Sequence, residues 1–316
     1  MNKLLSANVD TTGITVSGLS AGAFFANQLL VAYSDVFSGM GAIAGGPYLC
    51  AQGTLTGAIT HGLWGDPAPD VDYLVMQTRS LEEHGAVANL RNLEEARIWL
   101  FHGAHDETVS EATSESLARY CERFTRAHNI KVIDNIDVRH AMPTDTFARE
   151  KHTGVSEPYI TNVGYDAAGA LLEHLYGPLK PRTEATGEIV EFNQSEFLPG
   201  ARWHGMDHTG FLYLPTGARE GRPCKLHVAL HGCEQYAAKL GQTFVREAGY
   251  NAWAEANDII VLYPQTFPTV TFVVFNPKGC WDWFGADDAQ YFTRAGRQQR
   301  AIVRMVERLA GQSLVH

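Results

Sequence analysis

Val16-Ser17-Gly18-Leu19-Ser20-Ala21-Gly22-Ala23 is the stretch from which the fold of this chain can be predicted. It follows a short β-prone segment and leads into small, helix-forming residues, so it predicts a sharp turn between a strand and a helix. A serine at such a turn needs glycine two places before and two places after it, because a Cβ there would collide with the neighbouring strand or helix. The Gly-x-Ser-x-Gly pentapeptide therefore predicts a nucleophile elbow, with the Ser20 hydroxyl at the positive end of the following helix.

Length and composition are those of a globular protein with one large core. The chain has 316 residues, 45% of them hydrophobic, and we expect a single domain over residues 1–316. A formal net charge of −10 argues against a nucleic-acid partner, whose binding requires clustered Lys and Arg. No apolar segment reaches membrane-spanning length and no charged-then-apolar leader precedes Leu4, so we expect no membrane partner and no signal peptide in this chain.

The residues after the elbow predict a parallel sheet. Residues 23–33 are apolar almost all round, which is typical of a helix packed against a sheet. A second strand is predicted at residues 39–44. Strand, helix and strand in succession form a βαβ unit, which implies a parallel sheet with helices on its faces. Residues 51–70, rich in Gly, Thr and Pro, predict a loop over the site.

Asp106 follows the next buried strand, predicted at residues 97–103. In open α/β sheets, functional groups lie beyond the carboxyl ends of the strands, so Asp106 is where a carboxylate that orients a catalytic histidine is expected. Two alternatives remain. His102, His105 and Asp106 are candidate metal ligands, although no further ligand set has a recognisable spacing. Asp106 is also a candidate cap of the helix predicted at residues 111–127.

His140 follows a strand-like segment and precedes a proline-containing turn. A catalytic histidine must reach the serine from a loop at the same edge of the sheet, and this position allows that. The order Ser20, Asp106, His140 is the serine, acid and histidine order of α/β-hydrolases. The sequence therefore predicts these three residues as a catalytic triad.

One strand of the α/β-hydrolase pattern is absent from its usual place. In that fold a strand that supplies the second oxyanion donor precedes the nucleophile, yet only a dozen or so residues precede the elbow. A strand of this kind is predicted late in the chain instead, over residues 225–233. We therefore predict a circularly permuted α/β-hydrolase, with a mostly parallel central sheet and helices on both faces.

Further elements support this interpretation. Strands are predicted at residues 210–215 and 258–264, with a helix around residues 241–257 between them. In the permuted arrangement the half that bears the triad covers about residues 1–180, and the half that bears the oxyanion strand covers about residues 200–316. A polar segment near residues 180 to 200 joins them.

Six motifs in this order resemble those of the single-domain, circularly permuted poly(3-hydroxybutyrate) depolymerases, and the resemblance extends over nearly the whole chain. They are Gly18-Leu19-Ser20-Ala21-Gly22, Ala44-Gly45-Gly46-Pro47-Tyr48, the stretch from His140 to Asp145, Leu230-His231-Gly232-Cys233, Tyr263-Pro264-Gln265, and Asn276-Pro277-Lys278-Gly279-Cys280-Trp281-Asp282-Trp283.

The resemblance implies a serine esterase that hydrolyses poly(3-hydroxybutyrate) or its oligomers and needs no metal or organic cofactor. It implies that Ser20 is the nucleophile, His140 the base and Asp106 the residue that orients the base. It also implies an oxyanion hole made by the backbone N–H groups of Ala21 and Cys233. We expect no separate polymer-binding module of the kind found in many members of the family.

The resemblance also implies tryptophans in a surface crevice, at Trp281 or Trp283. These residues alternate around Asp282, so in an extended segment both rings would share one face and lie along an apolar polyester chain. Ordinary core aromatics are the alternative. Phe284 stands where the family often has Trp or Tyr. We expect Asp282 and the pair Asp287-Asp288 to be solvated surface residues or caps.

Two other classes of function remain open. One is a feruloyl or acetylxylan-type esterase, or another small-ester carboxylesterase, of the same architecture. The other is a noncatalytic binding protein, against which the complete Ser20, Asp106 and His140 set argues. The sequence does not decide the oligomeric state.

Five cysteines are too few for a disulfide scaffold, and their odd number leaves at least one thiol unpaired within the chain. Cys233 and Cys280 each follow a glycine in loops that the permuted architecture would bring near the mouth of the site. They are the pair we expect to form a disulfide, with two buried thiols in a cytosolic enzyme as the alternative. The family resemblance favours an extracellular or periplasmic location over the cytoplasm. The five are Cys50, Cys121, Cys224, Cys233 and Cys280.

Overall fold

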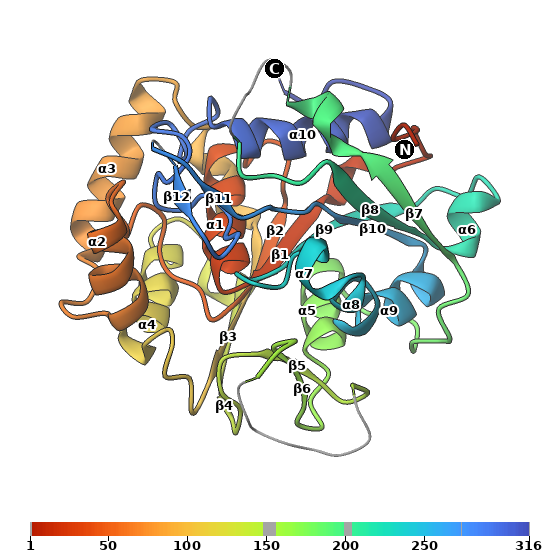
Figure 1. The fold of residues 1–316 in the computed structure, drawn as a ribbon, viewed down its shortest axis with the longest axis horizontal. Coiled ribbons are helices and arrows are strands. Elements are labelled where there is room, and N and C mark those ends of the chain that lie inside the picture. Colours follow the sequence, from red (N-terminus) through yellow and green to blue (C-terminus); the bar gives the residue numbers. More distant parts are fainter. Residues whose placement is uncertain (1, 148–155, 199–203, 273, 316) are drawn as a thin grey trace.

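The centre of the fold is an eight-stranded sheet with the strand order β4-β3-β2-β1-β9-β10-β8-β7 (Figure 1). This computed structural model describes residues 2–147, 156–198, 204–272 and 274–315. Neighbouring strands from β4 to β10 run parallel, and β8 and β7 extend the sheet with antiparallel pairs. The strands are β1 (Thr15–Leu19), β2 (Gly39–Ile43), β3 (Arg97–Gly103), β4 (Ile130–Ile136), β7 (Glu188–Asn193), β8 (Thr209–Leu214), β9 (Lys225–Leu230) and β10 (Ile259–Tyr263).

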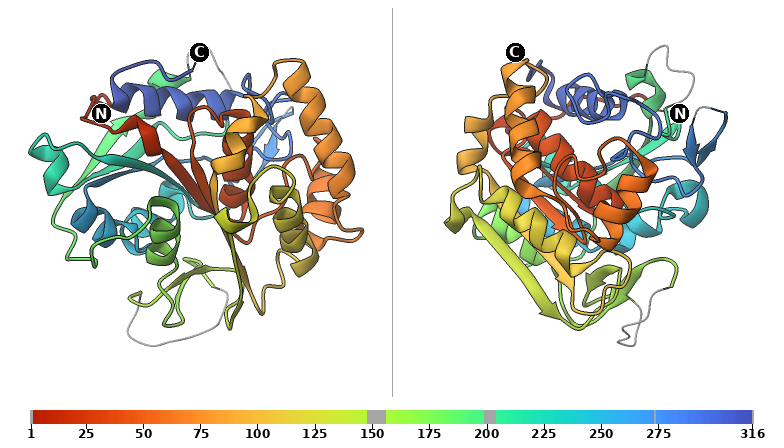
Figure 2. Two further views of the ribbon diagram at one scale, coloured as in Figure 1. Left: turned by 180° about the vertical axis from the view of Figure 1, so that it is seen from behind. Right: turned by 90° about the vertical axis from the view of Figure 1, so that its left-hand side faces the viewer.

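Helices cover both faces of this sheet (Figures 1 and 2). On one face lie α1 (Ala21–Ala32), α4 (Glu111–Cys121) and α10 (Arg297–Ala310), with α3 (Val71–Glu83) packed on α4, and on the other lie α5 (Ala167–Tyr176) and α9 (Tyr250–Asn257). Every residue of β1, β2 and β10 is buried, as expected for parallel strands covered on both sides. The predicted α/β class, with a mostly parallel sheet and helices on both faces, is confirmed.

Shorter elements connect this framework. Two small sheets pair β5 (Met142–Thr144) with β6 (Ile160–Asn162) and β11 (Thr269–Val270) with β12 (Phe275–Asn276). The short helices are α2 (Leu55–Gly57), α6 (Thr216–Arg219), α7 (Ala237–Leu240) and α8 (Thr243–Glu247), and the helical turns are η1 (Thr11–Gly13), η2 (Ala58–Trp64), η3 (Leu90–Glu95), η4 (Ala127–Asn129) and η5 (Gln194–Phe197). Among the described residues, no helix combines the length and the apolar character needed to cross a membrane.

The late strand β9 lies beside β1, with Val16 level with Val228 in a parallel pair. These two strands are more than 200 residues apart in the sequence, and their pairing is the adjacency that the predicted permutation requires. The carboxyl end of β9 thus meets the carboxyl end of β1, where the elbow begins. The predicted division of the domain near residues 180 to 200 stays a prediction, although that segment contains β7, an edge strand of the same sheet.

Two local predictions are wrong. Residues 51–70 do not form an irregular loop, because α2 and η2 lie within them. Their Gly and Thr content resembles that of a loop, yet Thr54 caps the first turn through its side chain. The helix predicted around residues 241–257 is two helices, α8 and α9. They are separated at Gly249, whose φ of 93° lies in the left-handed region and interrupts a right-handed helix.

Candidate active site

Ser20 lies between β1 and α1 in a strained backbone conformation, with φ 54° and ψ −123°. The two flanking glycines make this turn possible. A Cβ on Gly18 would lie 2.2 Å from the carbonyl carbon of Gly22, and a Cβ on Gly22 would lie 2.5 Å from the carbonyl oxygen of Leu230. Such distances are shorter than any Cβ contact, so the elbow requires glycine at both places, as its spacing predicts.

The side chains of His140 and Asp106 are hydrogen-bonded, with Nδ1 of His140 2.8 Å from Oδ2 of Asp106. The other oxygen of Asp106 accepts the backbone N–H groups of Thr108 and Val109. Burial alone would raise the pKa of Asp106, but the hydrogen bond and charge of His140 and the two backbone donors outweigh it, and the pKa lies below its ordinary value. Asp106 is therefore a carboxylate that holds one orientation of the His140 ring.

Asp106 is not the cap of the following helix, which was one alternative from the sequence. The N-cap of α4 is Ser110, whose side chain accepts the N–H of Thr113. His140 precedes β5 rather than ending a strand, and it lies in a bend between β4 and β5.

A cavity of about 560 Å³ brings Ser20 and His140 together with the loop after β9. Ala21 and Cys233 also line it. Within the described part of the chain, the backbone N–H groups of Ala21 and Cys233 have no hydrogen-bond acceptor. For Ala21 the reason is its place as the first residue of α1. Two free N–H donors thus lie at the same cavity as the Ser20 hydroxyl.

The loop after β9 is fixed from several directions. A disulfide joins Cys233 to Cys280, which confirms the predicted pair, and Cys50, Cys121 and Cys224 are buried thiols. The indole N–H of Trp281 donates to the carbonyl of His231, 3.0 Å away. The residues that would present the second N–H donor are therefore held by both a covalent bond and a buried hydrogen bond.

The prediction that Trp281 and Trp283 share one face is wrong. The N–H of Trp283 donates to the carbonyl of Trp281, 3.0 Å away, so the segment turns here instead of extending. Trp281 is completely buried against Phe25 and does not line the cavity. Trp283 does line it, stacked on Phe24 with ring centroids 4.0 Å apart. Of the two tryptophans, one is a core residue and the other forms a wall of the cavity.

Of the acidic residues expected to be solvated or caps, Asp282 and the side chain of Asp287 are buried, so neither is solvated. Asp288 accepts the backbone N–H of Arg297, the first residue of α10, and so acts as a cap. Asp282 accepts the backbone N–H groups of residues 285 to 288 and so shapes the turn that follows Trp283. Neither carboxylate oxygen of Asp287 has a hydrogen-bond donor among the described residues, and Nη1 of Arg297 lies 3.6 Å from Oδ1. Burial raises the pKa of Asp282 to about 6 against its backbone donors, and burial and the charge of Asp282 raise that of Asp287 to about 7.

These two carboxyl groups make stability depend on pH. Their ordinary pKa value is 3.8, so between about pH 4 and pH 7 the folded chain binds more protons than the unfolded chain, and stability falls as pH rises through that window. We expect Asp287→Asn to flatten this dependence and to raise the free energy of unfolding at pH 8 by about 1 to 3 kcal/mol. Thermal denaturation from about pH 4.5 to 8 measures it. In the exposed control Asp137→Asn, stability should depend on pH as in the wild type. If the stability of Asp287→Asn also fell with pH as steeply as that of the wild type, burial of the Asp287 carboxyl would not cause the dependence.

The sequence did not indicate several walls of the cavity. Apolar side chains come from the helical segment α2–η2, namely Leu55, Ala58, Ile59 and Leu63. Tyr159 comes from the loop before β6, and Phe275 comes from β12. The low polarity of residues 55–63 could have indicated that they line the cavity. The prediction of a loop there did not take it into account.

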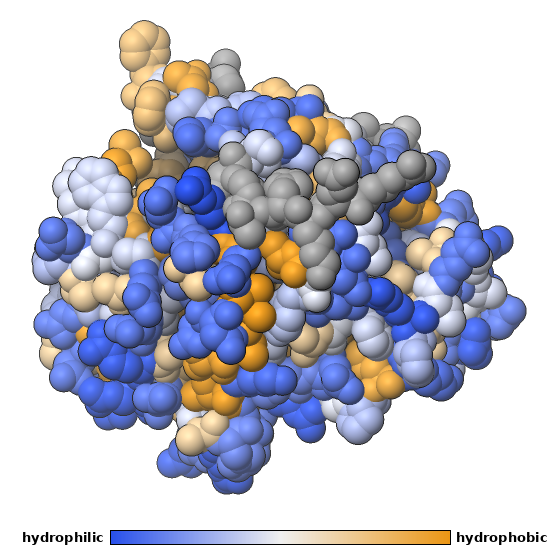
Figure 3. Space-filling view, turned by 90° about the horizontal axis from the view of Figure 1, so that it is seen from below, coloured by the Kyte–Doolittle hydropathy of each residue, from blue (hydrophilic) through white to orange (hydrophobic). Residues whose placement is uncertain are grey.

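Apolar side chains are also exposed on the hairpin formed by β11 and β12, which projects from the body of the molecule (Figure 2, right). Phe267, Val270, Phe272 and Phe275 are all exposed, and Phe275 lines the cavity as well. Seen from below, the edge of the molecule is mostly hydrophilic, and a group of apolar side chains projects from it at the upper left (Figure 3). An apolar surface is thus continuous with the mouth of the cavity.

A second serine–histidine pair lies inside the core. Oγ of Ser17 is 2.7 Å from Nε2 of His227 and 2.8 Å from the Tyr250 hydroxyl. Ser17 and His227 are completely buried, and burial lowers the pKa of His227 to about 3. A substrate cannot reach this pair, so we interpret it as a link between β1, β9 and α9.

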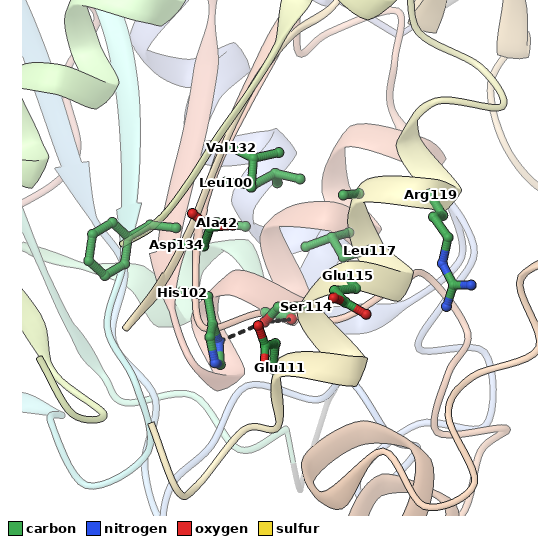
Figure 4. Close-up of a pocket in the computed structure, with 13 residues that line it drawn as sticks. Ala42, Leu100, His102, Glu111, Ser114, Glu115, Leu117, Arg119, Val132 and Asp134 are labelled. Atoms are coloured by element: carbon green, nitrogen blue, oxygen red, sulfur yellow. Dashed lines mark hydrogen bonds between the residues drawn. The ribbon is translucent and has the colours of Figure 1, made fainter. Parts of the chain in front are cut away.

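A separate hollow of about 400 Å³ lies between α4 and the sheet edge formed by β3 and β4 (Figure 4). Nδ1 of His102 lies 3.0 Å from Oγ of Ser114 at its base, and burial lowers the pKa of His102. This hollow shares no lining residue with the cavity at Ser20.

The metal-site alternative has no support in the positions of its residues. His102 is bonded to Ser114 in the second hollow, His105 lies 3.5 Å from Asp137, and Asp106 is bonded to His140. Over residues 2–147, 156–198, 204–272 and 274–315, no group of three or more His, Cys, Asp or Glu side chains could hold a metal ion.

The chain is similar to curated proteins that are named as polyhydroxybutyrate depolymerases. It is 40% identical over 313 residues to the poly(3-hydroxybutyrate) depolymerase of Delftia acidovorans, covering 97% of this chain and 61% of that protein. It is 38% identical over 315 residues to the polyhydroxybutyrate depolymerase of Talaromyces funiculosus, covering 96% of this chain and 91% of that protein. The chain thus spans less than two thirds of the first relative and nearly all of the second.

Solved structures agree with these relatives. The crystal structure of a PHB depolymerase from Penicillium funiculosum has a TM-score of 0.91 and 35% identity, over 98% of this chain and 99% of that one. A PHB depolymerase variant complexed with an R3HB trimer gives the same values. The model of the prolyl oligopeptidase family matches residues 4–157. With an α/β-hydrolase fold and this degree of identity over nearly its full length, the chain belongs to the poly(3-hydroxybutyrate) depolymerase family.

Proposed function

We propose that this chain is a serine esterase that hydrolyses poly(3-hydroxybutyrate) or its oligomers. The observation that carries the proposal is the shared cavity, which is lined by Ser20, by His140, and by Ala21 and Cys233, whose backbone N–H groups have no acceptor among the described residues. Acyl transfer needs these groups together: a nucleophile, a base and donors for the oxyanion. The relatives named above supply the substrate class.

In the proposed mechanism, His140 takes the proton of the Ser20 hydroxyl as the serine attacks an ester carbonyl. The carbonyl oxygen becomes an oxyanion, and the N–H groups of Ala21 and Cys233 stabilise it. His140 then gives its proton to the leaving alcohol, and a water molecule activated by the same ring hydrolyses the acyl-enzyme. Asp106 stays ionised, consistent with the direction of its pKa shift, and stabilises the imidazolium.

The walls of the cavity suit a polyester better than a polar ester. Leu19, Ile59, Leu63, Trp283 and Phe284 line it, so a chain of methyl-bearing ester units would bury apolar surface there. Turnover of amorphous poly(3-hydroxybutyrate) beside a feruloyl ester, at equal ester concentration, tests the assignment. We expect release of 3-hydroxybutyrate units to dominate. Preferential cleavage of the feruloyl ester would overturn it in favour of a small-ester carboxylesterase.

The exposed hairpin supports a polymer as substrate. We expect Phe272→Ser to weaken adsorption to a poly(3-hydroxybutyrate) film by about tenfold, because burial of a phenylalanine contributes roughly 1.5–3 kcal/mol. Hydrolysis of soluble p-nitrophenyl butyrate should stay unchanged. Val132→Ser is the matched control, since Val132 is also exposed but lies on β4 beside the second hollow. Equal adsorption of Phe272→Ser and wild type would show that the hairpin does not contact the polymer.

The disulfide between Cys233 and Cys280 supports an extracellular or periplasmic location, because disulfides persist in oxidising compartments. The oxidation state in the native host tests this part of the proposal. Mass spectrometry of protein trapped with an alkylating reagent at lysis should find both thiols protected, and their full alkylation would favour the cytoplasm.

A further inference from the structure

Gln235 connects the two segments that carry the oxyanion donor and the base. Its side chain is 1% exposed and lies just before α7, in the loop that follows β9. Oε1 accepts the N–H of Gly232 at 2.7 Å. Nε2 donates to the carbonyls of Pro158 at 2.9 Å and Tyr159 at 3.3 Å. One amide side chain therefore engages backbone groups of two loops that are more than 70 residues apart.

The first of these bonds determines which N–H group of the loop is free. Gly232 and Cys233 are consecutive, and both line the cavity. Because the N–H of Gly232 is taken by Gln235, the N–H of Cys233 is left for a ligand in the cavity. The preceding carbonyl, that of His231, is held by Trp281, so the peptide between His231 and Gly232 is bonded at both its oxygen and its nitrogen.

The contact of Gln235 with Tyr159 links it to the segment that contains the proposed base, His140. The carbonyl of Tyr159 also accepts the N–H of Met142, two residues after His140, at 2.8 Å. Tyr159 has a φ of 58° in the left-handed region, which a residue with a large side chain adopts only when its surroundings hold it there. Tyr159 lines the cavity, so Gln235 fixes a wall of the site and its links to the His140 segment.

We propose that Gln235 is a positioning residue for acyl transfer, which sets the oxyanion donor of Cys233 relative to His140. This inference rests on the proposed esterase function. Without the amide, the Gly232 N–H would be buried and unbonded, and the peptide would rotate to find another acceptor. The Cys233 N–H would then turn away from the position of the oxyanion, which affects the transition state more than the bound ester.

We expect Gln235→Leu to lower kcat for p-nitrophenyl butyrate by about 10- to 100-fold, with KM within about twofold, because loss of a complete oxyanion donor lowers kcat by about 10²- to 10³-fold. Gln235→Glu gives a second and sharper readout. A protonated glutamic acid keeps one acceptor and one donor, whereas an ionised one loses the donor and places a negative charge beside the oxyanion. The ratio of variant to wild-type kcat should therefore rise as pH falls.

When the kcat of the variant is divided by that of the wild type, the effects of titrating groups that are present in both proteins cancel. The charged neighbours Glu157, Glu234, Lys239 and Lys278 pair among themselves at the rim. Among the residues that the structure describes, the nearby imidazoles are those of His140, on the facing segment, and His231, on the same loop. All of them are present in both proteins, so a pH trend in the ratio reports on position 235.

Gln194 provides a matched control. It is completely buried, its Oε1 accepts the N–H of Gln265, and its Nε2 donates to two carbonyls, as in Gln235, but it does not line the cavity. Gln194→Leu and Gln194→Glu should lower the melting temperature and leave kcat within about twofold of wild type, with a kcat ratio that does not depend on pH.

Ser20→Ala, assayed in parallel with the same ester, separates the two proposals. If Ser20→Ala is inactive and the Gln235 variants behave as the Gln194 variants do, Gln235 has only a structural role and this inference is wrong. If Ser20→Ala retains activity, the proposed function itself fails. If Gln235→Leu does not fold, the pH trend of Gln235→Glu still decides, and a flat ratio would overturn the inference.

Discussion

Ser20→Ala is expected to lower kcat by about 10⁶-fold with little change in stability, because the account assigns to Ser20 the only covalent bond to the substrate. The variant keeps the elbow, since alanine is no larger than serine. Steady-state hydrolysis of p-nitrophenyl butyrate measures the loss, and circular dichroism checks the fold. A phosphonofluoridate-type reagent should label wild-type protein at Ser20 in a one-to-one ratio and should not label the variant.

Ser17→Ala is the control for this experiment. Ser17 lies on β1, three residues before Ser20, and its hydroxyl is hydrogen-bonded to the His227 ring. Its replacement leaves a buried imidazole without one bond and should lower stability by about 1–3 kcal/mol while kcat changes little. Loss of activity in Ser17→Ala, with Ser20→Ala active, would transfer the nucleophile to the buried pair and contradict the account.

Asp106→Asn is expected to lower kcat by about 10⁴-fold while the fold stays intact. The carboxylate accepts the Nδ1 proton of His140, and an asparagine amide would favour the other tautomer, which cannot accept the proton of Ser20. The assay is the same ester hydrolysis with a thermal melt beside it. Asp137→Asn, an exposed neighbour, should be as active as wild type.

Treatment with a chelator distinguishes this role from the metal alternative. The triad account expects EDTA to leave activity unchanged. Inactivation by EDTA with recovery on addition of zinc would instead favour a site built on His102 and His105. An Asp106→Asn variant with nearly full activity would show that the carboxylate does not orient the base.

The sequence was informative where the chemistry depends on local spacing. The pentapeptide spacing predicted glycine at position 18, which contacts Gly22 within the turn, and at position 22, which contacts the carbonyl of Leu230 at the end of β9. The position of Asp106 follows from the carboxyl end of β3 in the parallel sheet. The pairing of β1 with β9 and the bond between Cys233 and Cys280 followed from the assumption that the usual strand had moved in the chain. These features depend on fold class more than on side-chain packing.

Predictions failed where a nonlocal bond decides the direction of a side chain. The alternation of Trp281 and Trp283 suggested an extended segment, but the indole N–H of Trp281 donates to the carbonyl of His231, 50 residues away in the chain, and Trp281 is completely buried. Gln235 and Tyr159 do not belong to any of the sequence motifs recognised above. Their positions depend on contacts between loops that are distant in the chain, which a residue pattern does not encode.

Direct observation of the acyl-enzyme tests the central claim of the account. Wild-type protein mixed with an (R)-3-hydroxybutyrate oligomer and quenched in acid within the first turnover should yield, on peptide mapping by mass spectrometry, a 3-hydroxybutyryl group on Ser20. The adduct should be absent when the quench follows complete hydrolysis. A hydroxybutyryl group on another residue, or rapid hydrolysis with no adduct at any quench time, would contradict a Ser20 acyl-enzyme.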